Sequence, residues 1–185
     1  MNELETRAFE LAGIEIRDDD DGYHHLVGIV APWAATYDTG RYIESFGPKV
    51  FDKSIKERGD RIPLLEQHNR SANPVGMSVS WEKTADGLVG DFRLARTNRG
   101  EEVRQLATDG MVTGLSVGFH PVRNQQRTVN GRQHVSRIEA RLDHVGFVTA
   151  PAYDNAQVLA VRGFDPDDDE LAPRLARWRH LLNTD

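Results

Sequence analysis

One serine and two histidines of this sequence are candidates for nucleophilic chemistry. Ser116 stands among small and apolar residues in GLSVGF, His68 ends the apolar segment IPLLEQH, and His144 lies in a long alternating segment. A serine hydroxyl is a weak nucleophile until a neighbouring base takes its proton, and the base works best when a third group fixes its tautomer. The three residues could supply these roles. Taken alone, a serine like Ser116 is most often a small filler in a half-buried strand.

The segment 138–148 alternates like a strand and places His144 on the more apolar face, together with Leu142 and Gly146. An imidazole there needs hydrogen-bond partners for both ring nitrogens. A core histidine satisfied by backbone groups is the alternative interpretation. Asp143 is the next residue along the chain but points to the other face, so it could replace His144 only if a bulge interrupts the strand.

Other site chemistries find little support. The chain has no cysteine, which excludes disulfides, thiolate catalysis and cysteine zinc sites. A calcium loop that uses Gly22 as its sixth residue would begin at Arg17, a cation, and the acidic run 165–170 has no glycine. None of the seven histidines has a compact metal-binding spacing. A metal site assembled from His68 and His144 remains an alternative.

The length and composition of the chain indicate a single domain with a tail. The 185 residues carry a net charge of −6, concentrated in two acidic runs, which argues against binding nucleic acid through its phosphates. The opening MNELETRAFEL does not resemble a secretory signal. No segment approaches the roughly 18 to 20 apolar residues that span a membrane.

The elements that must position the candidate residues are mostly strands. A helix is predicted over 48–58, and another over 97–110, where Asn98 and Glu101 have capping-box spacing. Asp86-Gly87 and Asn130-Gly131 predict hairpins. Strand patterns cover 26–38 with a break at Pro32, 41–46, 61–68, 75–84, 87–95, 111–122 and 136–152, with weak alternation before residue 18. We therefore expect a β-dominated α+β fold, with a mostly antiparallel β-barrel or sandwich core flanked by two or three helices.

Five segments, in order, resemble the prohead (capsid maturation) protease family of tailed bacteriophages, typified by phage HK97. They are LVGIVAPWAATYD, ESFGPKVFDKSI, LLEQHNRSANPVG, GLVGDFRLARTNRGEEVRQLATDGMVTGLSVGF and LDHVGFVTAPAYDNAQVLAVR, within residues 26–162. The family is similar to herpesvirus assembly proteases, which implies a β-barrel ringed by helices. The resemblance makes Ser116 the nucleophile, with small neighbours that admit a substrate carbonyl, and His68 the general base and acid.

The chain departs from the family at one position of its site. The last strand of the family usually reads Leu-x-Glu-Val-Ser, whereas residues 142–146 read LDHVG, so that His144 replaces the glutamate. The resemblance to herpesvirus enzymes, which have a Ser-His-His triad, makes His144 the orienting group. A neutral histidine stabilises an imidazolium less than a carboxylate does, so a slow enzyme is expected. Asp143, through a bulge, is the alternative third member.

The resemblance implies a serine endopeptidase without metal or organic cofactor. We expect it to act inside the procapsid, in the cytoplasm of the infected bacterium, on the major capsid protein, on scaffold and on itself. No nucleic acid or membrane partner is expected, and a homodimer is left open. Alternatives are an inactive capsid-assembly module and a histidine-based metallohydrolase. The protease domain is assigned to 1–162, and 163–185 to a tail with an acidic start and an amphipathic helix.

Overall fold

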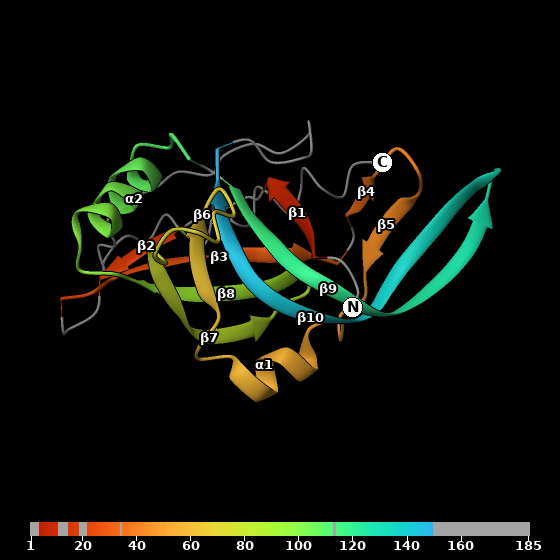
Figure 1. Cartoon of the computed structure of the whole chain (residues 1–185), viewed down its shortest axis with the longest axis horizontal. Coiled ribbons are helices and arrows are strands. Elements are labelled where there is room, and N and C mark those ends of the chain that lie inside the picture. Colours follow the sequence, from red (N-terminus) through yellow and green to blue (C-terminus); the bar gives the residue numbers. More distant parts are fainter. Residues whose placement is uncertain (1–3, 11–14, 19–21, 34, 113, 150–185) are drawn as a thin grey trace.

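The computed structural model describes residues 4–10, 15–18, 22–33, 35–112 and 114–149. In these ranges strands dominate over helices, as predicted (Figure 1). The strands are β1 (Glu5–Glu10), β2 (Glu15–Asp18), β3 (His24–Pro32), β4 (Thr36–Asp38), β5 (Ile43–Phe46), β6 (Pro63–Glu66), β7 (Gly76–Lys83), β8 (Gly87–Leu94), β9 (Gly114–Val129) and β10 (Arg132–Val148). The helices are α1 (Asp52–Arg58) and α2 (Asn98–Thr108), and the helix predicted within 163–185 lies outside the described residues.

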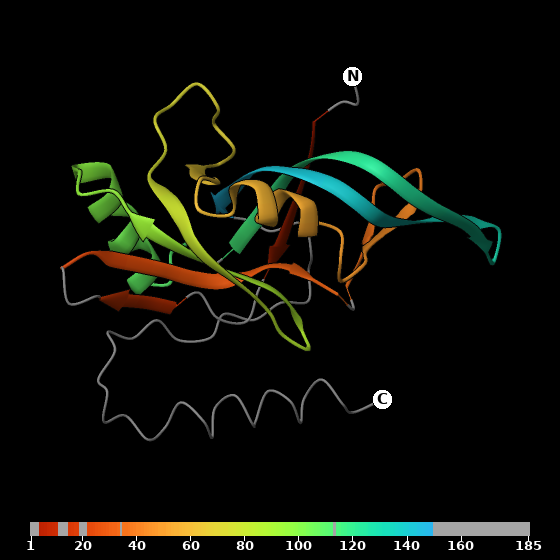
Figure 2. The same ribbon diagram turned by 90° about the horizontal axis from the view of Figure 1, so that it is seen from below.

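All ten strands belong to one curled, mixed sheet. Its main path runs β1-β9-β10-β6-β7-β8-β3-β2, and β5, which also pairs with β4, joins it at β10. Every pair is antiparallel except β10 with β5 and β10 with β6. The sheet curls into a half-barrel, from which the β9–β10 hairpin extends as an arm (Figures 1 and 2). The expected mostly antiparallel β-barrel or sandwich is therefore confirmed only as a β-dominated curled sheet.

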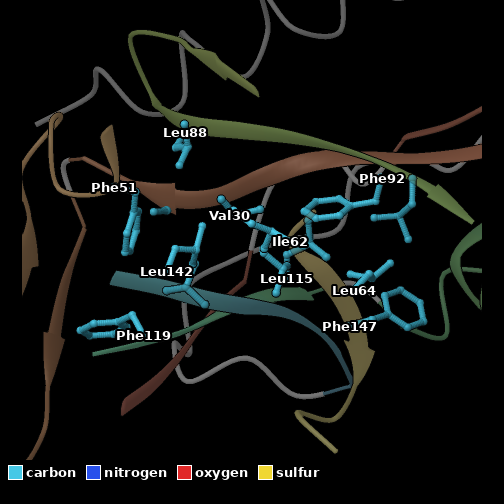
Figure 3. Close-up of a cluster of buried hydrophobic side chains, with 14 of the residues drawn as sticks. Val30, Phe51, Ile62, Leu64, Leu88, Phe92, Leu115, Phe119, Leu142 and Phe147 are labelled. Atoms are coloured by element: carbon cyan, nitrogen blue, oxygen red, sulfur yellow. The ribbon is translucent and has the colours of Figure 1, made fainter. Parts of the chain in front are cut away.

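The hydrophobic core fills the space between the two walls of this curl (Figure 3). One wall contributes side chains of β3 and β8, and the other contributes those of β6, β9 and β10. The largest of these buried residues include Leu26, Leu64, Leu88, Phe92, Leu115, Phe119 and Leu142. Along β9, Leu115, Val117 and Phe119 face this core, so Ser116 between them faces the other side of the strand.

Both predicted helices form, with shifted starts. Helix α1 begins at Asp52 rather than residue 48, because the chain first makes a turn that buries Val50 and Phe51 in the core. Helix α2 is capped by Thr97, whose backbone is extended and whose hydroxyl accepts a hydrogen bond from the Gly100 amide. Thr97 therefore takes the capping role that the spacing assigned to Asn98. Neither helix has the length and apolar character required to cross a membrane.

A buried charge network joins β1, β5 and β10. Glu44 of β5 is 1% exposed, and its carboxylate accepts hydrogen bonds from Arg7 of β1 and, at 2.5 Å, from Nε of Arg137 of β10. Glu5 of β1 accepts from the same Arg137 guanidinium at 2.9 Å. Two cations therefore face two carboxylates, and they fasten the first strand to the base of the β9–β10 arm.

Replacing Glu44 with Gln should destabilise the fold by about 3 to 5 kcal/mol, because two desolvated guanidiniums would then lose a charged partner. Urea denaturation of the two proteins measures this difference. The matched control is Asp38→Asn, which weakens an exposed pair with Arg132 and should leave the midpoint nearly unchanged. Equal midpoints for Glu44→Gln and the unaltered protein would contradict the role assigned to the network.

Candidate active site

The structure brings Ser116, His68 and His144 together from three parts of the chain. Ser116 lies on β9, His144 on β10, and His68 just beyond the end of β6. Nε2 of His68 is 2.5 Å from Oγ of Ser116, and Nδ1 of His68 is 2.7 Å from Nε2 of His144. Ser116 and His144 are buried, while His68 is partly exposed. The three residues singled out from the sequence therefore form one hydrogen-bonded chain.

His68 reaches this position because β6 pairs in parallel with β10. Leu65 lies opposite Gly146 and Glu66 opposite Phe147, after which the chain turns sharply. Gln67 has φ 46° and His68 φ 58°, the left-handed conformation that costs a non-glycine residue about 1 to 2 kcal/mol. The turn brings the imidazole back over β10. Backbone strain of this kind persists where the surrounding structure fixes it, and it clusters at functional sites.

Two glycines make room for the imidazole rings. A Cβ at Gly118 would lie 2.2 Å from the ring of His144, and a Cβ at Gly146 would lie 2.6 Å from the ring of His68. Real Cβ atoms do not approach other atoms so closely, so each ring occupies the space that a side chain would fill. From the sequence, the small residues around Ser116 are expected to admit a substrate carbonyl. Gly118 also makes room for His144, a role that its place in the motif does not reveal.

A bulge in β10 changes which side chains face the site. The pairing passes from Leu142 opposite Phe119 directly to His144 opposite Gly118, which leaves Asp143 as the extra residue. Leu142 therefore packs in the core, whereas His144 and Gly146 face the site. The prediction that Leu142 and His144 share one face is wrong, because the inserted residue breaks the alternation of the strand.

The same bulge turns Asp143 toward His144. Oδ2 of Asp143 lies 3.1 Å from Nδ1 of His144, so the carboxylate extends the chain beyond the third residue. The bulge anticipated for Asp143 exists, but the carboxylate meets His144 and not His68. Helix α1 holds the backbone here: the Leu142 amide donates to Oγ of Ser54 at 3.0 Å, and the Arg58 guanidinium donates to the carbonyl groups of Leu142 and Asp143.

Burial and charge set the protonation of this chain. Burial, with the unfavourable effect of a charged His144, lowers the pKa of His68 to about 4. Burial also lowers the pKa of His144, although the hydrogen bond and charge of Asp143 oppose this. Burial by itself would raise the pKa of Asp143. The hydrogen bond with His144 and the charge of Arg70 together outweigh this effect, so the pKa of Asp143 is below its usual value. Near neutral pH both histidines are therefore neutral and Asp143 is ionised.

The arrangement suits hydrolysis by a serine rather than by a metal. Among the residues that the structure describes, no group of three or more His, Asp or Glu side chains could hold a metal ion. His68 directs its two nitrogens at Ser116 and His144, and His144 directs its own at His68 and Asp143. A serine hydroxyl bonded to a histidine, which is in turn held by a further group, is the constellation of serine hydrolases on several unrelated folds.

Comparison with protein families gives this constellation a more specific context. The model of the caudovirus prohead serine protease family matches residues 12–167, and the chain belongs to this family. The family resemblance seen in the sequence over 26–162 is thereby confirmed. The fold is similar to that of the bacteriophage T4 capsid assembly protease gp21, with a TM-score of 0.59 and 13% sequence identity over 80% of this chain and 98% of that chain. No curated protein sequence matches the chain.

Adding one methyl group to either glycine should disable the site. Gly118→Ala and Gly146→Ala force His144 or His68 to move, and a displacement of about 1 Å at a reacting group can cost about 100-fold in rate. We expect kcat/KM for peptide cleavage to fall at least that far, with a circular dichroism spectrum that shows a folded protein.

The control for both variants is Gly47→Ala, whose new Cβ would lie 3.4 Å from the Arg137 carbonyl oxygen, an ordinary contact. This variant should retain its activity. Full activity in Gly118→Ala or Gly146→Ala would show that the ring positions described here are not those of the working site.

Proposed function

We propose that Ser116, His68 and His144 are the catalytic triad of a serine endopeptidase that acts in prohead maturation. Membership of the prohead serine protease family makes the chain a serine protease. The observation that supports these particular residues is the continuous chain from Oγ of Ser116 through both nitrogens of His68 to Nε2 of His144, with spacings of 2.5 and 2.7 Å. The spacing between His68 and His144 is at the short end of the range usual for hydrogen bonds from nitrogen, and the spacing between His68 and Ser116 is shorter still.

The proposed reaction begins as a peptide carbonyl reaches Ser116. Oγ attacks the carbonyl carbon while Nε2 of His68 takes the hydroxyl proton, and the imidazolium then gives this proton to the leaving amine. The C–N bond breaks and an acyl ester of Ser116 remains. Water repeats the sequence: His68 takes its proton, the hydroxide attacks the ester, and the proton returns to Ser116. No metal or organic cofactor takes part.

His144 holds His68 in the correct orientation by accepting its Nδ1–H. Being neutral, His144 stabilises the imidazolium less than a carboxylate would, so we expect turnover to be slow. A slow enzyme suits a protease that acts once, at high local concentration, inside an assembling shell.

The substrates we propose are the phage's own scaffold and major capsid proteins, together with the protease itself, inside the procapsid of the infected bacterium. Membership of a prohead family supports this location and these partners. The fold similarity is to a protein described as a capsid assembly protease. A relationship to herpesvirus assembly proteases, and a homodimer like theirs, are further parts of the proposal.

Loss of the Ser116 hydroxyl should abolish cleavage. The chain is co-expressed with the capsid and scaffold proteins of its phage, beside Ser116→Ala, and the products are sized by intact mass spectrometry. Ser45→Ala is the matched control, because its hydroxyl contacts that of Ser136 at the base of the β9–β10 arm, away from the candidate site. Cleavage that survives Ser116→Ala but not a chelator would favour a metallohydrolase. Particles that assemble uncut with the unaltered chain would favour an inactive module.

The acidic limb of the kcat/KM profile should lie well below the ordinary histidine value of about 6.5. His68 must be neutral to accept the proton, and its pKa is lowered to about 4. Activity should therefore persist as the pH falls through 6 and decline only as it approaches 4. Because His68 interacts with His144, the apparent pKa that this limb measures is a property of the two histidines together. A limb at 6.5 or above, measured with a peptide substrate, would contradict the protonation states described.

A further inference from the structure

We propose that Asp143 is a positioning residue of this site, whose carboxylate selects the tautomer of His144 and, through it, the tautomer of His68. The inference rests on the proposed roles of Ser116 and His68. Its basis is the third link of the chain, the 3.1 Å contact between Oδ2 of Asp143 and Nδ1 of His144. Neither the fold of the family nor the replacement at position 144 requires this link.

Two neutral imidazoles that share one hydrogen bond can be arranged in two ways. In the first, Nδ1–H of His68 donates to Nε2 of His144, which leaves Nε2 of His68 free to accept the Ser116 proton. In the second, Nε2–H of His144 donates to Nδ1 of His68. Nε2 of His68 then carries a proton and cannot act as the base. Only the first arrangement is competent for catalysis, and the two histidines alone do not choose between them.

The Asp143 carboxylate makes the choice because it can only accept hydrogen bonds when ionised. In the competent arrangement, Nδ1 of His144 carries a proton and donates it to Oδ2 of Asp143. In the other, the Nδ1 lone pair of His144 would face the carboxylate at 3.1 Å, and two acceptors would be opposed in a buried place. Asp143 therefore fixes the protonation of a residue that it does not touch, His68.

The surroundings keep this carboxylate in place and ionised. The Asp143 side chain is 17% exposed, and Oδ2 lies 3.5 Å from the guanidinium of Arg70 in the loop after β6. Arg141 approaches Oδ1 at 3.9 Å, and Arg58 of α1 donates to the backbone carbonyl of Asp143 at 2.9 Å. Of the other titratable groups here, His120 of β9 acts on His144, and His144 in turn acts on His68. Three cations thus surround Asp143, and the bulge aims it at Nδ1 of His144.

Three substitutions separate the roles of the carboxylate. Asp143→Ala removes the acceptor and the charge, Asp143→Asn keeps an acceptor without the charge, and Asp143→Glu keeps both. We expect kcat/KM to fall about 10- to 100-fold in the alanine variant, as it does when outer partners of other functional histidines are removed. The loss should lie in kcat, with KM unchanged. Asparagine should be intermediate, and glutamate should recover most of the activity.

The pH profile distinguishes this role from a structural one. Removing the negative charge makes both histidines harder to protonate, so the acidic limb of kcat/KM should move to lower pH in Asp143→Ala and Asp143→Asn. A variant that was only less well folded would lower the plateau without moving the limb. Asp91→Ala is the matched control, because Asp91 makes a similar contact with Nδ1 of His25, at 2.7 Å, between β3 and β8. It should leave both the plateau and the limb unchanged.

Nitrogen-15 NMR of the imidazole rings reads the tautomers directly. The full-length Ser116→Ala protein, which avoids self-cleavage, should show Nδ1 protonated and Nε2 unprotonated in both His68 and His144 at neutral pH. Adding Asp143→Ala should populate the opposite tautomers. The opposite pattern with Asp143 present would overturn the inference even if no Asp143 variant folded, as would unchanged kinetics in Asp143→Ala. Failure of the proposed triad is a separate result, seen as cleavage that survives Ser116→Ala.

Discussion

One extra residue in β10 determines the whole arrangement of the site. Before the bulge, Leu142 packs in the core, and after it His144 and Gly146 face the opposite side of the sheet. Without the insertion, strict alternation would place His144 on the same face as Leu142, among the core side chains. Asp143 would then point to the opposite face. The bulge therefore supplies two members of the chain at once, and Ser54 and Arg58 of α1 bind the backbone groups that it removes from regular pairing.

The site is otherwise built by close packing. The ring of His144 packs against Gly118 of β9, and the ring of His68 packs against Gly146 of the neighbouring strand β10. Neither glycine has a side chain that would occupy the space of the ring. The left-handed backbone at Gln67 and His68 stores strain that the parallel β6–β10 pairing must offset. Each imidazole ring is held by its contact with a glycine and by its hydrogen bonds. Close packing of this kind gives the precise positioning that the proposed proton transfer would require.

The chemistry could be predicted from the sequence better than its geometry could. Ser116, His68 and His144 stand out by type and by the family segments that contain them, and the structure places them together. The bulge leaves a weaker signal. In LDHVGFV the core residues Leu142, Val145 and Phe147 are three and then two positions apart, but the alternation expected from the sequence ran straight through this step, and a shift of one residue reverses every later side chain. The parallel pairing of β10 with β5 and β6 was missed for a related reason. Local turn signals such as Asp86-Gly87 report on neighbouring strands only, not on partners far apart in the chain.

The parallel pairing of β6 with β10 has a consequence for when the site can exist. His68 is separated by 48 residues from Ser116 and by 76 from His144, and the amide of its neighbour Gln67 donates to the carbonyl of Phe147 near the end of β10. In a growing chain, β6 cannot pair with β10 until the end of β10 has left the ribosome. Contacts this distant in sequence also form late in folding, since closing long loops is slow. Incomplete or partly folded chains thus carry Ser116 and His68 without any means of joining them, and the hydrogen-bonded chain of the candidate site depends on completion of the sheet.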